Sequence, residues 1–152
     1  MVKVTKEAEL PFSAKELFNA VADYEKFPDI FPSIRSAKVL KDEAGGKEVE
    51  MAFKVPPAIS AFLSSTTQTV HATATPDSAI HLHSTSGALK QMDIRWSFNE
   101  VAPGKTKVTF EMDYETGMSA AVNGTVKIFI NRSTKDLMDN LSDHVRSRQP
   151  KP

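Results

Sequence analysis

The chain contains no cysteine among its 152 residues. A disulfide framework and a metal site built from thiolates are therefore both excluded. Only six glycines are present, which leaves little room for a glycine-rich phosphate loop. The sequence also lacks a zinc-binding helix signature and a nucleophile elbow. Nineteen basic and nineteen acidic residues cancel, so no net charge attracts nucleic acid or anionic lipid.

Long apolar runs are also absent. No run approaches the ~20 residues that a membrane span needs. Residues 1–10 alternate charged and apolar side chains, unlike a signal peptide. We therefore expect a soluble cytoplasmic protein with no integral membrane segment and no nucleic-acid partner. The length predicts a single domain over residues 1–146, followed by a flexible tail over residues 147–152.

Near the N-terminus, a predicted helix runs into a turn that is rich in aromatic residues. Ser13 and Glu16 have the spacing of a capping box, which satisfies the first free N–H groups of a helix. The elbow that follows, residues 24–32, concentrates aromatic side chains and contains two prolines, Pro28 and Pro32, which prevent a long regular helix. We expect the elbow aromatics to pack against the end of a sheet rather than to contact a ligand.

Most of the remaining sequence alternates apolar and polar residues, as strands with one buried face do. The predicted strands are Val2–Leu10, Ile34–Lys41, Glu48–Val55, Ser65–Ala74, Ala79–Ser84, Leu89–Glu100 and Lys105–Glu115. Turn signals between consecutive strands favour an antiparallel sheet. Residues 117–146 change to a helical period, with Gly124 and the pair Ser133–Thr134 as weak points. This single long helix is the predicted cover of the apolar sheet face.

The segment FSAKELFNAVADYEKFPDIFPSIRSAKVL (residues 12–40) resembles the start of START-like (SRPBCC) proteins, in particular the coenzyme Q-binding and polyketide cyclase/dehydrase branch. The resemblance rests on a V-x-D-x-x-x-aromatic-P pattern at residues 21–28. It extends to a G-x-L…W-x-F pattern at residues 87–98 and a T-x-V-x-F pattern at residues 106–110. It implies an α+β helix-grip fold, in which a curved antiparallel sheet of six or seven strands wraps a long C-terminal helix, with two short helices after the first strand.

The resemblance also implies a cavity for a hydrophobic small molecule: a lipid, an isoprenoid quinone or a polyketide-like aromatic. The side chains predicted to face it are Met51, Phe53, Met92, Trp96, Phe110, Met112, Tyr114, Val126, Phe129, Ile130 and Ser133. The same pattern is typical of a packed core, and the preference for a cavity comes mostly from the resemblance. Trp96, Tyr114 and Ser133 offer polar groups that could orient a ligand. Residues 56–60 and 115–118 are candidate gates. No cofactor is predicted.

Two other functions remain open. A cyclase or dehydratase would need a titratable side chain in the cavity, for which Tyr114 and His71 are the candidates. A protein-interaction module would use the elbow or the outer face of the sheet.

The histidines on the predicted strands also suggest a metal site, because two imidazoles two residues apart share one face. However, Ile80 and Leu82 occupy the inward positions, so His81 and His83 point outward. A solvated polar face is therefore the favoured interpretation, and no metal is predicted. The charged residues with outward parity on the later strands are interpreted as cross-strand pairs rather than as acid–base pairs. They are Asp93, Arg95, Glu111 and Asp113.

Overall fold

The structure, a computed structural model, describes residues 2–61, 63 and 65–149. Its strands are β1 (Val2–Leu10), β2 (Ile34–Glu43), β3 (Gly46–Phe53), β4 (Thr67–Thr75), β5 (Ala79–Gly87), β6 (Gln91–Ala102) and β7 (Lys105–Glu115). Its helices are α1 (Ala14–Ala22), the 3-10 turn η1 (Tyr24–Lys26), α2 (Phe27–Ile30), α3 (Pro57–Ser60), α4 (Ala120–Thr134) and α5 (Leu137–Arg148). The predicted strands Val2–Leu10 and Lys105–Glu115 match β1 and β7 residue for residue.

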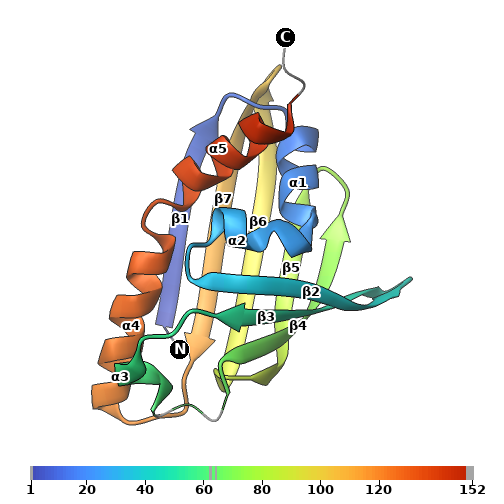
Figure 1. The fold of residues 1–152 in the computed structure, drawn as a ribbon. Helices are drawn as coiled ribbons and strands as arrows, with labels where there is room; N and C mark the ends of the chain where they lie inside the picture. The colour runs from blue at the N-terminus through green and yellow to red at the C-terminus, as the bar shows by residue number, and fades with distance from the viewer. Residues whose placement is uncertain (1, 62, 64, 150–152) are drawn as a thin grey trace.

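The described strands form one sheet in the order β1-β7-β6-β5-β4-β3-β2. Every neighbouring pair is antiparallel, which confirms the predicted arrangement. Figure 1 shows β2 and β3 lying across the direction of β6 and β7. The sheet therefore curls, and the helices lie against its concave face. This arrangement confirms the helix-grip fold.

The start of α1 is fixed by the predicted capping box. The Ser13 Oγ atom accepts a hydrogen bond from the Glu16 backbone N–H at 3.1 Å, and Glu16 Oε1 accepts one from the Ser13 backbone N–H at 3.2 Å. Leu17, Phe18 and Val21 of this helix are buried. The helix covers the end of the sheet at which β1 finishes, and the elbow continues from it (Figure 1).

The predicted C-terminal helix is bent, because Lys135 and Asp136 separate α4 from α5. The break follows directly after the weak point predicted at residues 133–134. The Thr134 hydroxyl donates to the Ile130 carbonyl at 2.9 Å, and such bonds to the preceding turn bend helices. The next amide, of Lys135, bonds to the Arg132 carbonyl three residues back. Gly124, the other predicted weak point, lies inside α4 without interrupting it.

The two parts of the helix pack differently. Five of the 12 residues of α5 are buried, against three of the 15 residues of α4. The end of α5 is also tied to the elbow and to α1, because Arg148 pairs with Asp23 at 2.9 Å and Gln149 donates to Glu16 at 2.9 Å. The helix thus extends into the predicted tail as far as Arg148. The last three tail positions, 150–152, lie outside the described residues.

No helix among the described residues combines the length and the apolar character that crossing a membrane requires.

A buried histidine joins α5 to the elbow, and it makes folding sensitive to pH. Burial lowers the pKa of His144 below its ordinary value of 6.5; Asp29 and Asp23 oppose the shift, whereas Arg148 and Lys26 add to it. The unfolded state therefore binds a proton at a pH where the native state does not, so the free energy of unfolding falls as the pH drops below 6.5.

We expect His144→Gln to reduce this loss. Chemical denaturation of the wild-type protein and of the variant between about pH 7 and pH 5 measures the difference. The free energy of unfolding of the variant should fall less steeply with decreasing pH. Equal slopes would show that His144 does not contribute to the pH dependence.

Candidate functional site

A cavity of about 80 Å³ lies between the sheet and α4. Its walls come from segments far apart in the sequence: the elbow, four strands, α3 and α4. The described residues that line it are Phe27, Phe31, Ser33, Ile34, Met51, Phe53, Val55, Ile59, Leu63, Ala88, Leu89, Met92, Ile94, Met112, Val126, Phe129, Ile130, Ser133 and Thr134.

One face of α4 forms one wall of the cavity. Val126, Phe129, Ile130 and Ser133 are spaced at i, i+3, i+4 and i+7, which places them on a single helical stripe. The opposite wall comes from alternate residues of the central strands, whose side chains share the concave face of the sheet. Three of them are methionines, Met51, Met92 and Met112, whose flexible and polarizable side chains adapt to ligands of different shape.

The turn between β5 and β6 forms part of the rim, and a glycine holds it in place. Gly87 has a φ of +137°, and a Cβ atom there would lie 2.5 Å from the Thr67 carbonyl oxygen. Only glycine fits this approach. The next two amides are also anchored to β4, since Ala88 donates to the Thr67 carbonyl at 2.8 Å and Leu89 to the Gln68 side chain at 2.9 Å.

Polar groups are scarce in the cavity. The hydroxyls of Ser33 and Ser133 hydrogen-bond to each other and so connect the start of β2 to α4. The Thr134 hydroxyl is occupied by the Ile130 carbonyl. Among the described lining residues, none carries a side chain that titrates near neutral pH. The arrangement can bind an apolar body and offer it one pair of hydroxyls.

The structure brings together eight of the eleven residues predicted from the sequence. Met51, Phe53, Met92, Met112, Val126, Phe129, Ile130 and Ser133 line the cavity. Trp96, Phe110 and Tyr114 are not among its lining residues; all three are buried.

The three residues outside the lining belong to the packed core. The ring centroids of Trp96 and Phe110 are 5.0 Å apart, and that of Phe31 is 6.3 Å from Trp96. The Trp96 indole N–H and the Tyr114 hydroxyl have no hydrogen-bond partner among the described residues. Burial raises the pKa of Tyr114 above its ordinary value. In this conformation neither group is positioned as the predicted polar handle.

Two of the elbow aromatics were not among the residues predicted to line the cavity. Phe27 and Phe31 line the cavity, because the curl of the sheet turns the elbow over its concave face. The predicted gate at residues 56–60 contributes Ile59, whereas none of residues 115–118 is among the lining residues. Periodicity could not find the rim residues Ala88 and Leu89, which lie in a turn.

The chain is similar to a known protein family and to curated proteins. Residues 10–142 match the family model described as polyketide cyclase/dehydrase and lipid transport. Among curated proteins, the ribosome association toxin RatA of Escherichia coli K12 is similar, with 22% identity over 93% of this chain and 82% of the relative. The persistence and stress-resistance toxin PasT of E. coli O6:H1 is similar to the same extent.

Solved structures share the fold at low identity. The Zhui aromatase/cyclase from Streptomyces sp. R1128 has a TM-score of 0.80 and 16% identity, covering 97% of this chain and 96% of that one. A START superfamily protein from Mycobacterium smegmatis has a TM-score of 0.74 and 17% identity, covering 97% of this chain and 99% of that one.

The fold and the cavity define a START-like protein with a helix-grip architecture. Because the family model covers most of its length, the chain belongs to the polyketide cyclase/dehydrase and lipid transport family.

The Ser33–Ser133 bond is the testable polar feature of the cavity. We expect Ser133→Ala to lower the free energy of unfolding by about 1 kcal/mol, because it leaves the Ser33 hydroxyl without its partner. A double-mutant cycle with Ser33→Ala, measured by chemical denaturation, should give a coupling energy of about 0.5–1.5 kcal/mol. Ser36→Ala, at an exposed position of β2, is the control and should change little. Additive effects of the two cavity substitutions would show that the hydroxyls are not coupled.

Proposed function

We propose that this protein binds a hydrophobic small molecule in the cavity between the sheet and α4, and acts as a carrier or chaperone without covalent chemistry. The observation that carries the proposal is the mostly apolar lining, in which the only polar side chains among the described residues are the paired hydroxyls of Ser33 and Ser133 and the Thr134 hydroxyl, which is bonded within α4. Ligand sites of this kind take their affinity from buried apolar surface and their orientation from a few polar groups. Membership of a family described by lipid transport and by polyketide cyclisation supports the same class of ligand.

The size of the cavity indicates that binding requires a conformational change. Ligand pockets usually enclose about 300–1,000 Å³, whereas this cavity encloses about 80 Å³. The helix α4 is the element best suited to move. Few of its residues are buried, and α3 packs beside it. The break at Lys135–Asp136 is the natural hinge, since α5 beyond it is anchored to the elbow. Displacement of α4 would widen the cavity toward α3.

The hydroxyl pair indicates which end of the ligand is polar. Ser33 and Ser133 bond to each other across the gap that would open, so movement of α4 would release both groups. A ligand carbonyl or hydroxyl could then replace the lost bond. A lipid, an isoprenoid quinone and a polyketide-like aromatic all combine an apolar body with such a group. We therefore place the oxygen-bearing end of the ligand at the start of β2.

Catalysis in the same cavity receives less support. A cyclase or dehydratase moves protons, which requires a titratable group within reach of the substrate. Of the two sequence candidates, His71 hydrogen-bonds to Glu48 at 3.0 Å outside the cavity, and Tyr114 does not line it. The structural likeness to an aromatase/cyclase concerns the fold, at 16% identity.

Association with the ribosome, which the curated relatives carry in their names, is not supported by a specific feature of the described residues. Binding to RNA depends on positively charged surface, and the basic and acidic residues of this chain are equal in number.

A matched pair of tryptophan substitutions on α4 tests the cavity as the binding site. Val126 is 3% exposed and faces the cavity, whereas Ile128 of the same helix is 55% exposed. We expect Val126→Trp to fill the cavity and to weaken the binding of a hydrophobic fluorophore by about tenfold or more, equivalent to at least 1.4 kcal/mol. Ile128→Trp adds the same ring outside the cavity and should leave the affinity unchanged. Fluorescence titration with 1-aminoanthracene measures both.

Native mass spectrometry after gentle purification identifies the natural ligand. A lipid, quinone or aromatic that copurifies with the wild-type protein and is absent from Val126→Trp would support the proposal. A protein that is consistently empty and that fails to bind the fluorophore would overturn it.

A further inference from the structure

We propose that the outer face of the sheet carries a binding site for a divalent transition metal, formed by His81 and His83 of β5 and Asp93 of β6. This site lies on the opposite side of the sheet from the cavity and is independent of the function proposed above. The sequence indicates that both histidines point outward, and the structure adds a carboxylate on which both imidazoles converge.

The geometry of the three side chains is that of a cluster around one point. His81 Nε2 lies 2.8 Å and His83 Nδ1 lies 2.9 Å from the same atom, Asp93 Oδ1. One nitrogen from each histidine and one oxygen from the aspartate lie within 4.8 Å of one another. Two imidazoles that share one carboxylate oxygen differ from an ordinary ion pair, in which one partner faces one partner.

The sheet itself imposes this convergence. His81 and His83 are two residues apart on one strand, so their side chains share a face. Asp93 is the direct cross-strand neighbour of His83, and it reaches His81 diagonally. The Asp93 side chain is 14% exposed, against 42% for His81 and 52% for His83. The carboxylate therefore forms the floor of the cluster, and the imidazoles stand above it, open to solvent.

Small movements convert this cluster into a coordination sphere. Zinc binds nitrogen and oxygen ligands at about 2.0–2.2 Å, so neighbouring ligand atoms in a tetrahedral site lie roughly 3.3–3.5 Å apart. Each nitrogen must therefore move about half an ångström away from the Asp93 oxygen, which exposed imidazoles can do. The metal would take the place of the hydrogens that now lie between the Asp93 oxygen and the two imidazole nitrogens, His81 Nε2 and His83 Nδ1. In each neutral ring, the proton would then sit on the other nitrogen.

The set of donor atoms selects the class of metal. Two imidazoles and one carboxylate suit Zn²⁺, Cu²⁺ or Ni²⁺, whereas Mg²⁺ and Ca²⁺ prefer sites made of oxygen. Three protein ligands leave a coordination position for water or for a further ligand. His81 also lines a hollow on this face together with Thr73, Arg95 and Glu111, so a further ligand of the metal would have room.

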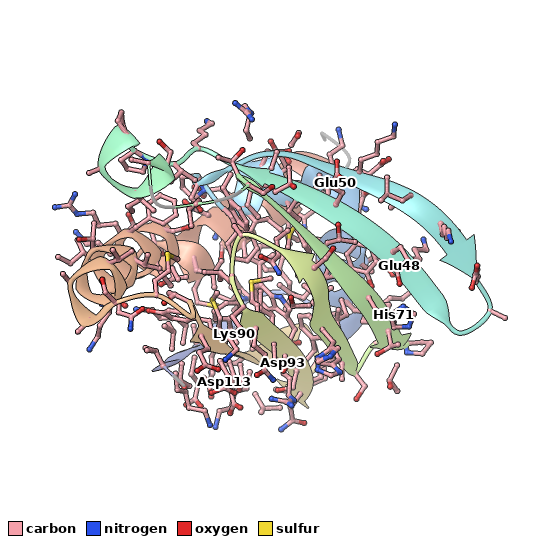
Figure 2. The ribbon with its side chains drawn as sticks, turned by 90° about the horizontal axis from the view of Figure 1, so that it is seen from below. Glu48, Glu50, His71, Lys90, Asp93 and Asp113 are labelled. Carbon is pink, nitrogen blue, oxygen red and sulfur yellow. The ribbon has the colours of Figure 1, made fainter. Side chains whose placement is uncertain are left out.

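The surrounding charges balance in favour of a cation. Asp113 is the direct neighbour of Asp93 on β7, and Figure 2 shows the two carboxylates on the same side of the sheet, with His71 further along it. Two adjacent carboxylates repel each other, and a divalent cation would relieve the repulsion. Arg95 opposes a cation, but its guanidinium faces Asp113 at 3.7 Å.

Titration of the untagged, metal-free protein with Zn²⁺ tests the proposal. Isothermal calorimetry should show one Zn²⁺ site per chain, and Mg²⁺ at the same concentration should not bind. We expect His83→Asn or Asp93→Asn to weaken Zn²⁺ binding by about a hundredfold, at least the loss that follows from removing an outer-shell partner. His71→Asn is the control, because His71 is the direct cross-strand neighbour of His83 but both of its ring nitrogens face other partners, the Glu48 carboxylate at 3.0 Å and the Gly45 carbonyl at 3.2 Å. This control should bind Zn²⁺ like the wild type.

Paramagnetic broadening by Ni²⁺ gives a second measurement, which uses only the wild-type protein. The NMR signals of the His81 and His83 rings should disappear at the first equivalent of Ni²⁺, while those of His144 on α5 persist. The proposal is overturned if Zn²⁺ does not bind, if His71→Asn weakens binding as much as His83→Asn does, or if all four histidines broaden together.

Discussion

The concave face of the curled sheet is mostly apolar, with Gln68 and Thr106 as buried polar residues on it, and the rest of the structure depends on how that face is covered. An antiparallel sheet with one apolar face cannot leave it in water. The elbow and α5 cover the end at which β1 finishes, with close packing and with an ion pair between Arg148 and Asp23. The other end is covered by α4, of which only Val126, Ile130 and Thr134 are buried. The cavity lies under the loosely packed half of the cover.

The interruption of the C-terminal helix allows this division of roles. A single straight helix could not stay in contact with a curved surface along its whole length. Two helices joined at Lys135–Asp136 can each take the direction that fits their own part of that surface. The half formed by α5 is closely packed, whereas the half formed by α4 has few buried residues. The Ser33–Ser133 bond connects α4 to the start of β2, so under the proposed function this hydrogen bond would have to break before α4 could move to admit a larger ligand.

The alternation of residues along each strand gives the two faces of the sheet different chemistry. On β5, Leu82 points into the core, while His81 and His83 on either side of it meet Asp93 on the outer face. The same period that builds the ligand cavity thus assembles a polar cluster on the reverse side. The two sites share strands but no side chains, so each can change without disturbing the packing of the other.

Local features of the fold could be predicted from the sequence because they depend on residues near one another in the chain. The capping box at Ser13, the bounds of β1 and β7 and the outward direction of His81 all follow from short-range spacing. The break after Thr134 was visible as a weak point, but not as a break. Whether a helix bends at such a pair depends on the surface against which it packs.

The residues that line the cavity could be predicted only in part. All the predicted residues face inward, but alternation does not say where along a strand the helix stands away from the sheet. That distance is set by curvature, which turned Phe27 and Phe31 into the cavity and left Trp96 and Tyr114 in solid packing. The sequence by itself determined which side chains face inward and which outward, since the periods of strands and helices are local properties. Only the tertiary structure decided which inward residues meet open space and which outward residues meet one another, because both depend on strands brought together from distant parts of the chain.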